Sequence, residues 1–282
     1  MRTQESYRSA VLAGAKRLRQ AEVPDAELDA RLLMEHVTGW DSAAWLMNRE
    51  AVMPEPMRQY YERLVERRAA REPLQYITGE QEFMGLTFRV TPSVLIPRQD
   101  TELLVEQALP LCAGKRVLDV CTGSGCVLIA LAHYAPLLRA VGADISREAL
   151  EIASYNGEKH GVRAEWVQSD LLASVEGTFD VIVANPPYIT AEEMRTLMPE
   201  VGAHEPELAL FGGEDGLSFY RRLVPEAKKR LAGGTETGGW LLVEIGCAQG
   251  EAVARLFSEN GFRDVAVQRD YAGRDRVVKG RL

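Results

Sequence analysis

The residues of this chain best suited to chemistry are Asn185, Pro186, Pro187 and Tyr188. They follow a mostly apolar run, residues 179–184, that predicts a buried strand. Each proline fixes its own φ and cannot donate to a strand ladder, and the residue before a proline is held extended. The Asn185 side chain and the Pro186 carbonyl are therefore rigid acceptors at a strand end. Together they could hold an –NH2 group and aim its nitrogen outward.

Tyr188 adds an aromatic face beside these acceptors. Such a ring can pack on a planar amide or a base, or lie near a cation. A simpler interpretation is a Pro-Pro turn that closes the strand, with Asn185 as a capping residue. Ligands in open α/β sheets bind at the carboxyl ends of strands. The position of the motif therefore favours the functional interpretation, with all four residues in the catalytic site.

A glycine-rich turn follows an earlier predicted strand, residues 116–120. The turn consists of Cys121, Thr122, Gly123, Ser124 and Gly125. Glycines at such a place let the backbone approach a ligand closely. The turn is not the dinucleotide-binding G-x-G-x-x-G, because Cys121 occupies the first glycine position, and it lacks the Gly-Lys-Ser/Thr ending of a P-loop. It fits a nucleoside-type ligand without a bound phosphate better than NAD or ATP.

Acidic residues end the next two predicted strands. Asp144 ends the strand at residues 140–144, where an acid can accept two hydrogen bonds from ribose hydroxyls. Asp170 follows the next strand and is placed to accept from an exocyclic adenine amine, with Leu171 beside it. Either acid alone is often a helix N-cap, but three strand ends in register with Asn185 form a specific set. We therefore expect these residues and the turn to bind a cofactor.

Strands and helices alternate through the C-terminal two-thirds of the chain. The predicted strands are residues 116–120, 140–144, 164–168, 179–184, 240–245, 265–268 and 276–279. The predicted helices are residues 103–109, 125–134, 146–160, 217–231 and 249–260. This alternation implies an α/β fold with a doubly wound, mostly parallel seven-stranded sheet. The last two strands have no helix between them and imply an antiparallel edge pair.

The first part of the chain has a different pattern. Apolar residues at helical spacing predict helices throughout residues 1–72. From Pro73, alternation and glycines predict a β-hairpin with strands within residues 74–79 and 83–90. The predicted organisation is an N-terminal helical-bundle docking domain at residues 1–74, a β-hairpin linker at 75–90 and an α/β domain at 91–282.

The last N-terminal helix is rich in arginine. Its arginines are Arg63, Arg67, Arg68 and Arg71. One interpretation is a docking patch for an RNA-bound partner. The favoured interpretation is a solvated helix face offset by Glu62 and Glu66, because mixed charges at helical spacing are ordinary surface chemistry.

Three further features lie around the predicted site. Asp100 or Thr101 is expected to cap the helix that follows, whereas capping does not explain Arg98, which is expected to point into the site. The long segment at residues 189–216 favours a lid over a simple connector. His204, within it, is expected to have a structural role rather than to act as a base.

Composition excludes several classes of protein. The formal net charge is −8, and residues 1–90 carry 13 Lys and Arg against 14 Asp and Glu, so most of the excess acid lies after residue 90. This excess of acidic residues argues against tight binding of a nucleic acid duplex, which depends on neutralising phosphates with Lys and Arg. The four cysteines form no C-x-x-C pair and predict no metal site. Neither a signal peptide nor an apolar run of about 18 residues is visible, which predicts a cytoplasmic protein with no membrane span.

The motifs together resemble the PrmC/HemK family, within the class I, Rossmann-like S-adenosylmethionine-dependent methyltransferases. The motifs that carry the resemblance are residues 118–119, the turn at residues 122–125, Asp144, Asp170, residues 185–188, residues 73–79, residues 95–102, residues 204–206, residues 215–217 with Tyr220 and Arg221, residues 244–246 and residues 273–278. The likeness is dense from Pro73 onward and looser before it. Cys121 departs from the pattern: a small residue fits the turn, but its backbone is not expected to reach glycine-only angles.

The resemblance implies S-adenosylmethionine as cofactor and class I peptide chain release factors as protein substrate. Family members methylate N5 of the glutamine in the Gly-Gly-Gln loop. The implied enzyme needs no direct nucleic acid contact, and we expect a monomer. Two alternatives remain open. An N6-adenine DNA methyltransferase uses a similar motif on a flipped base but normally needs a basic cleft. A non-catalytic S-adenosylmethionine-binding module would not need Asn185 to Tyr188 intact.

Overall fold

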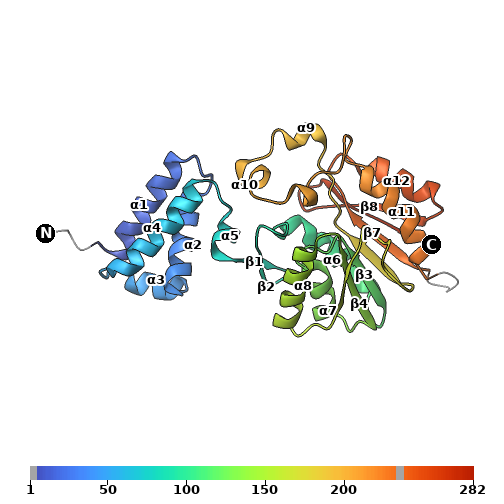
Figure 1. Ribbon diagram of the computed structural model, residues 1–282, viewed down its shortest axis with the longest axis horizontal. Coiled ribbons are helices and arrows are strands. Elements are labelled where there is room, and N and C mark those ends of the chain that lie inside the picture. Colours follow the sequence, from blue (N-terminus) through green and yellow to red (C-terminus); the bar gives the residue numbers. More distant parts are fainter. Residues whose placement is uncertain (1–4, 233–237) are drawn as a thin grey trace. The chain divides into compact units, whose positions relative to one another are not determined.

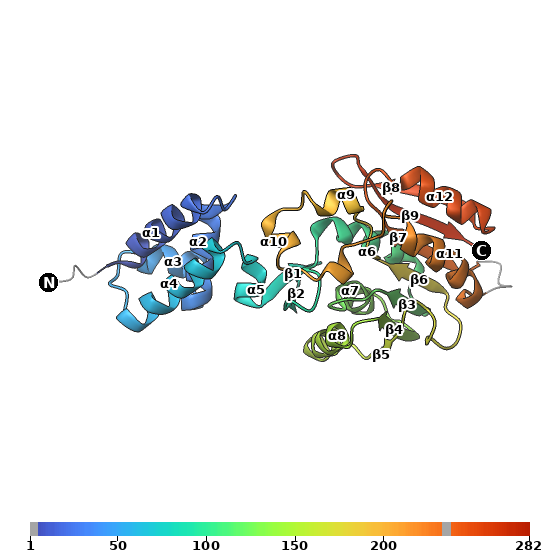
Figure 2. The same cartoon turned by 45° about the horizontal axis from the view of Figure 1, so that its top comes forward.

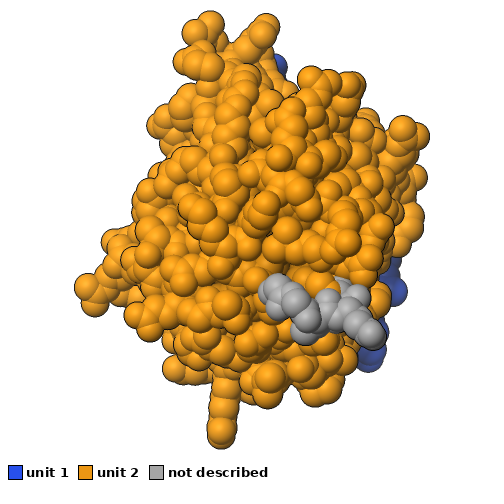
Figure 3. Space-filling view, turned by 90° about the vertical axis from the view of Figure 1, so that its right-hand side faces the viewer, with its two compact units in different colours: residues 1–79, 198–204 blue, residues 80–197, 205–282 orange. Residues whose placement is uncertain are grey.

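The computed structural model describes residues 5–232 and 238–282 (Figure 1). The chain divides into two compact units, which Figure 3 colours separately. Unit 1 comprises residues 1–79 with 198–204, and unit 2 comprises residues 80–197 with 205–282. A short stretch of the predicted lid thus belongs to the helical unit, which local sequence patterns could not indicate.

Unit 1 is a helical bundle. Its helices are α1 (Tyr7–Gln20), α2 (Ala26–Thr38), α3 (Ser42–Asn48), α4 (Glu55–Ala69), α5 (Leu74–Thr78) and α10 (Pro199–Gly202). Ser6 begins α1 by accepting a hydrogen bond from the Ser9 amide, and Gly39 ends α2 in the left-handed region. Helical spacing buries residues such as Leu18 and Leu33 in one shared core, as the periodicity predicts.

The predicted strand at residues 74–79 is wrong, because these residues form α5. Pro73 precedes the helix and Gly79, at φ +81°, ends it, which is the usual punctuation of a short helix. The hairpin begins only afterwards, with β1 (Glu80–Phe83) and β2 (Leu86–Arg89) pairing antiparallel. Its phenylalanines pack in the core of unit 2, so the hairpin is part of that unit and not a free linker.

The prediction of a solvated arginine face on α4 is wrong for Arg68. This side chain is buried and lies 2.7 Å from Asp29 and 2.9 Å from Glu200. Arg71 lies 2.6 Å from the same Glu200. Glu66, expected to offset these arginines, instead pairs with Arg17. The partners of Arg68 come from α2 and α10, which are remote in sequence, so helical spacing within α4 could not reveal them.

Unit 2 is built on a seven-stranded sheet in the order β5-β4-β3-β6-β7-β9-β8. Its strands are β3 (Arg116–Val120), β4 (Arg139–Asp144), β5 (Glu165–Gln168), β6 (Val181–Ala184), β7 (Trp240–Glu244), β8 (Arg263–Arg269) and β9 (Asp275–Arg281). The first five strands in this order are parallel, whereas β9 runs antiparallel to both β7 and β8. The predicted sheet and its antiparallel edge pair are confirmed.

Helices cover both faces of the sheet (Figure 2). The helices of unit 2 are α6 (Glu102–Ala108), α7 (Cys126–Tyr134), α8 (Arg147–Lys159), α9 (Ala191–Met194), α11 (Ser218–Arg230) and α12 (Gly250–Glu259). Its 3-10 turns are η1 (Gln99–Thr101), η2 (Leu109–Leu111) and η3 (Glu207–Ala209). Val117 of β3 packs in the cluster with α6 and α7, and its neighbour Leu118 packs in the cluster with α11 and α12. Buried strands with apolar residues on both faces are typical of parallel sheets.

Candidate active site

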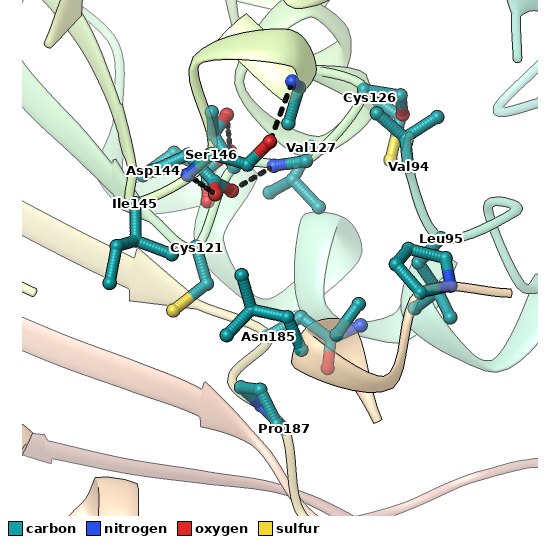
Figure 4. A pocket seen from close by; sticks show the side chains of 18 of the residues that line it. Val94, Leu95, Cys121, Cys126, Val127, Asp144, Ile145, Ser146, Asn185 and Pro187 are labelled. Carbon is teal, nitrogen blue, oxygen red and sulfur yellow. Dashed lines mark hydrogen bonds between the residues drawn. The ribbon is translucent and has the colours of Figure 1, made fainter. Parts of the chain in front are cut away.

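A cavity lies at the carboxyl ends of β3, β4, β5 and β6, within unit 2 (Figure 4). Residues 121–124 after β3, 144–146 after β4, 169–171 after β5 and Asn185 after β6 supply its wall on the sheet side. Residues 93–95, 97, 98, 101, 206, 208 and 209 supply the other walls, together with Phe219 and Arg222 of α11. The predicted strand-end residues therefore converge, as expected for a switch point in an open α/β sheet.

The glycine-rich turn has an unusual backbone. Gly123 and Gly125 have φ values of +54° and +79°, and Cys121 has φ +59°. The expectation that Cys121 avoids glycine-like angles is wrong, because it occupies the left-handed region at a cost of about 1–2 kcal/mol. A Cβ on Gly123 would meet nothing within 4 Å, whereas one on Gly125 would lie 3.1 Å from Trp166. Gly125 thus permits close packing beneath the turn, and Gly123 leaves space above it.

Asp119 belongs to a motif that carries the resemblance but was not among the site residues predicted from the sequence. It lies on β3, is 1% exposed, and accepts a 2.6 Å hydrogen bond from the Thr122 hydroxyl. Burial raises the pKa of Asp119 to about 7, although the Thr122 hydrogen bond opposes this shift. The Asp119 carboxyl stabilises the turn through its hydrogen bond with Thr122 and also contributes to the cavity wall.

Asp144 lies where the sequence placed it, at the end of β4, and it contacts the turn directly. Its carboxylate accepts 2.9 Å hydrogen bonds from the amides of Gly123 and Ser146. Burial raises its pKa, and these backbone donors act against the rise. The Asp144 carboxylate is thus held at the cavity edge by the backbone, in the position from which it could accept ribose hydroxyls.

Asp170 also lines the cavity, with a different partner. Its carboxylate lies 2.8 Å from Arg222 of α11, and both side chains are about half exposed. Leu171, which follows it, is buried at φ +51° and presents an apolar side chain beside the acid. The pairing with Arg222 was not foreseeable, because α11 follows much later in the chain.

Asn185 and Pro187 reach the cavity, whereas Tyr188 does not line it. The Asn185 Nδ2 atom donates to Thr101 Oγ1 at 3.2 Å. Pro186 is buried between its neighbours. The Tyr188 hydroxyl donates to Glu244 at 3.4 Å, and its ring packs against the core of unit 2. Within the motif, Asn185 therefore faces the cavity, whereas Tyr188 is fixed by Glu244 and by the core of unit 2.

The capping role expected of Asp100 or Thr101 is wrong. No side chain caps α6. The Asp100 carboxylate lies 2.9 Å from Arg276, and the Thr101 hydroxyl accepts from Asn185. Both residues contact segments distant in sequence, which spacing alone cannot predict.

Arg98 lies at the cavity, whereas His204 does not. Arg98 lines the cavity and pairs with the buried carboxylate of Glu205, which also accepts from the Ile96 amide at 3.2 Å. Glu205 thereby joins the segments at residues 93–98 and 206–209. His204 does not line the cavity.

The cavity suits a nucleoside linked to an aliphatic chain. Apolar side chains from Val94, Ile145, Leu171 and Phe219 form much of its lining, and Asp144 and Asp170 add acceptors at the rim. The open space above Gly123 leaves room beside the turn. Among residues 5–232 and 238–282, no group of three or more His, Cys, Asp or Glu could hold a metal ion. Within the same residues, no helix combines the length and apolarity needed to cross a membrane.

The fold and this site define a methyltransferase of the S-adenosylmethionine-dependent class. The PrmC N-terminal domain model matches residues 9–79, and the methyltransferase small domain model matches residues 98–201. A 16S rRNA methyltransferase from T. thermophilus, solved with AdoMet and guanosine, has a TM-score of 0.51 at 20% identity, covering 72% of this chain and 49% of that one. That likeness concerns the fold.

Sequence relatives narrow the class to one family. A release factor glutamine methyltransferase from Geobacter sulfurreducens is 44% identical over 94% of this chain and 93% of its own length. A protein-(glutamine-N5) methyltransferase (release factor-specific) from Alicyclobacillus acidocaldarius is 32% identical, covering 68% of this chain and 98% of that one, with a TM-score of 0.41. The chain belongs to the family of release factor glutamine methyltransferases. Its cofactor is S-adenosylmethionine, which supplies an electrophilic methyl group.

Proposed function

We propose that this enzyme transfers the methyl group of S-adenosylmethionine to the N5 amide nitrogen of the glutamine in the Gly-Gly-Gln loop of class I peptide chain release factors. The reaction supports translation termination. The observation that carries the proposal is the position of Asn185, a neutral amide fixed at the end of β6 and exposed to the cofactor cavity. A neutral acceptor is suited to orienting an amide –NH2 group.

Two oxygens of the motif are the proposed acceptors for the substrate amide. One is Asn185 Oδ1, whose residue lines the cavity, and the other is the carbonyl of Pro186, a buried residue that does not line it. Among the described residues, nothing donates to Asn185 Oδ1 or to the Pro186 carbonyl, whereas Asn185 Nδ2 is engaged by Thr101. These two oxygens can accept the two hydrogens of the substrate amide. Such contacts favour positive charge that develops on the nitrogen during transfer.

The transfer needs no strong base in the site. S-adenosylmethionine, held by the turn at residues 121–125 with Asp144 and Asp170, would supply the methyl group to the amide nitrogen and would leave as a neutral thioether once its bond to that methyl carbon is broken. The surplus proton on nitrogen then leaves to water. His204 does not line the cavity and has no step in this scheme. The contribution of Asn185 and Pro186 is orientation and electrostatic stabilisation.

The helical unit is proposed to dock the release factor. Several large apolar side chains of this unit are exposed, which is consistent with a protein-binding surface. They are Leu12, Leu28, Leu46, Met47 and Val52. The segment at residues 189–216 is proposed to act as a lid, because Leu208 and Ala209 line the cavity while Glu200 belongs to unit 1.

The net charge of −8 bears on the class of substrate. An acidic chain is poorly suited to neutralising phosphates, so we place the reaction on a protein substrate without direct nucleic acid contact. The enzyme is proposed to act as a monomer in the cytoplasm, where release factors work.

The test is methyl transfer from labelled S-adenosylmethionine to a purified release factor. A release factor with Ala in place of the Gly-Gly-Gln glutamine is the matched control. The expected result is label on the wild-type substrate and none on the control, with mass spectrometry locating one added methyl group on that glutamine. Equal labelling of both would place the target elsewhere on the release factor. An absence of label with retained cofactor binding would contradict the proposed function.

A further inference from the structure

A buried polar network lies directly behind Asn185. Its first member is Thr101, at the end of η1, which is 2% exposed, lines the cavity beside Asn185 and accepts the hydrogen bond from Asn185 Nδ2 at 3.2 Å. An asparagine amide has an –NH2 group that donates and an oxygen that accepts. If one of these two groups is hydrogen-bonded to Thr101, the other faces the cavity. The orientation of the Asn185 amide therefore depends on whether the Thr101 hydroxyl acts as an acceptor or as a donor.

The second member is Glu244, the last residue of β7 and 1% exposed. Strand β7 pairs in parallel with β6, and the register places Ala184 opposite Val243, so the Glu244 side chain lies beside the start of the motif. The Tyr188 hydroxyl donates to Glu244 Oε1 at 3.4 Å, and the Tyr220 hydroxyl donates to the Glu244 backbone carbonyl at 2.8 Å. The carboxyl therefore contacts the tyrosine end of the motif.

The other oxygen of this carboxyl is available to Thr101. Glu244 Oε2 is buried and has no hydrogen-bond partner among the described residues. The Thr101 hydroxyl nevertheless lies near enough to lower the pKa of Glu244. Because Thr101 Oγ1 already accepts from Asn185, its own proton is free to point toward the carboxyl. Glu244 thus lies beside both ends of the motif, through Thr101 and through Tyr188.

The direction of hydrogen bonding along this network is set by charge. An ionised carboxylate only accepts, so it requires Thr101 to donate to it and leaves the Thr101 oxygen to accept from Asn185 Nδ2. Asn185 Oδ1 then faces the cavity, which is the orientation that a substrate –NH2 group needs. A protonated carboxyl could donate to Thr101 instead, and the Thr101 proton could then satisfy Asn185 Oδ1.

The charged groups that act on Glu244 lie on η1 and β9, and the titratable hydroxyls of Tyr188 and Tyr220 also face it. Arg276 of β9 attracts it, whereas Asp100 of η1 repels it, and Arg276 is itself held 2.9 Å from Asp100 and 3.3 Å from Asp270. Burial raises the pKa of Glu244 to about 7, while Thr101 and Arg276 lower it. The carboxyl therefore changes charge close to neutral pH.

We propose that Thr101 and Glu244 are positioning residues that hold the Asn185 amide with its oxygen toward the substrate. The proposal rests on the proposed function, since it concerns the same amide-orienting step. It also explains why a threonine in the 95–102 motif and an acid in the 244–246 motif accompany residues 185–188 in this chain. Neither residue lies in contact with the reacting nitrogen in this scheme; both act through Asn185.

The activity test compares Thr101→Val, Thr101→Ser, Glu244→Gln and a control, Glu102→Gln. The control removes a neighbouring carboxyl that accepts from the Met84 amide at 2.7 Å and does not line the cavity. We expect Thr101→Val and Glu244→Gln to lower kcat about 10-fold to 100-fold, the range associated with small misplacement of a reacting group. Cofactor affinity should be unchanged, Thr101→Ser should restore most of the lost kcat, and Glu102→Gln should leave kcat unchanged. An unchanged kcat in Thr101→Val would overturn the proposal.

The pH profile supplies a readout that a purely structural role would not change. Wild-type kcat should fall as pH drops below about 7, and this limb should disappear in Glu244→Gln. Asp119, the other buried carboxyl with a pKa of about 7, could produce a similar limb. The Asp119→Asn variant should therefore retain the limb. A limb that persists in Glu244→Gln and disappears in Asp119→Asn would assign the titration to Asp119 and contradict the role of Glu244.

An NMR measurement separates this inference from the proposed function. The side-chain amide signals of Asn185, assigned by their absence in Asn185→Ala, should show one proton protected from exchange in the wild type. Thr101→Val should remove that protection and Thr101→Ser should retain it. Equal exchange in wild type and Thr101→Val would overturn the inference even if the enzyme methylates glutamine. Protection without any methylation of a release factor would instead contradict only the proposed function.

Discussion

The buried guanidinium of Arg68 lies 2.9 Å from the carboxylate of Glu200, which joins helix α4 to helix α10 within unit 1. Arg71 adds a second contact to the same carboxylate at 2.6 Å. Although partial burial works against it, these two arginines lower the pKa of Glu200 to about 2. The short helix α10 is thus attached to the bundle by charge rather than by a large apolar face.

Replacing Glu200 by Gln should destabilise unit 1. The change leaves Asp29 as the remaining carboxylate beside Arg68, whose Nη1 also donates to the Glu72 carbonyl at 3.2 Å. Removing one partner from a buried ion pair is expected to cost about 3 kcal/mol in the free energy of unfolding. Urea unfolding near neutral pH measures the loss. Glu66→Gln is the matched control, since its pair with Arg17 is exposed and should contribute little. Equal stability of the two variants would mean that the Glu200 pair contributes no more than an exposed pair.

The same pair should give stability a specific pH dependence. The folded pKa of Glu200 is lower than its ordinary value, so its contribution is present above about pH 4.5 and is lost as pH falls toward 2. Glu200→Gln should therefore show a smaller loss of stability over that interval than the wild type. Acid titrations followed by circular dichroism would reveal this difference, and parallel curves would contradict it.

Asn185→Ala should reduce kcat about 100-fold, by analogy with the loss of one preorganised polar group in a transition-state site. The Thr101 hydroxyl loses its donor, but the fold should persist because Asn185 is not part of the core. Steady-state methylation of a release factor measures the effect. Asn260→Ala, which removes an amide at the end of α12 far along the chain, is a suitable control. Near-normal turnover in Asn185→Ala would remove Asn185 from the mechanism.

Asp144→Asn should weaken cofactor binding. The carboxylate accepts from the Gly123 and Ser146 amides, and an asparagine can keep only one oxygen acceptor while presenting an –NH2 group to the other donor. We expect about a 10-fold rise in Kd for S-adenosylmethionine, measured by calorimetry, which corresponds to about 1.4 kcal/mol. Asp215→Asn, in an exposed pair with Arg221, should leave Kd unchanged.

The fold of unit 2 was predictable because the spacing of apolar residues along the chain distinguishes strands from helices. The ends of the α/β elements fall within two residues of their predicted positions, and the turn at residues 121–125 lies between β3 and α7 as expected. The miss at α5 has a local cause. Five residues between Pro73 and Gly79 are too few to show a helical period, and their mixture of apolar and polar side chains also fits a strand.

The cofactor side of the site was predictable because acids at parallel strand ends meet at one sheet edge. The layer behind Asn185 was not, because Thr101 precedes a helix and its sequence context predicts an N-cap. A signal was present for Glu244. It ends a strand in the same way that Asp144 does, and the order of strands in the sheet decides which strand-end acid faces the cavity and which lies beneath the motif.

Cys121→Gly should increase stability slightly and retain activity. Cys121 has φ +59°, a region that glycine occupies without steric cost. Relief of that cost outweighs the greater flexibility of glycine in the unfolded chain, for a net gain of about 0.5 kcal/mol. Thermal unfolding of the two proteins decides the sign. Cys112→Ala, a buried cysteine away from the turn, should instead lower the melting temperature, which shows that the gain depends on backbone angle and not on loss of a thiol.

Asp119→Asn should change how stability depends on pH. The folded pKa of Asp119 is raised to about 7 by burial, so the ionised carboxyl is less favourable in the folded state than in the unfolded state. Its contribution is complete below its ordinary pKa of about 4 and is lost as pH rises through about 7. The asparagine keeps an acceptor for the Thr122 hydroxyl and does not titrate, so the fall in stability from about pH 5 to 7 should become smaller. Glu244 titrates over the same interval, so some fall in stability should remain.

Urea unfolding from about pH 5 to 7 compares Asp119→Asn with the wild type. Asp180→Asn is the control, because its carboxyl pairs with Arg116, has a lowered pKa, and should not affect the slope there.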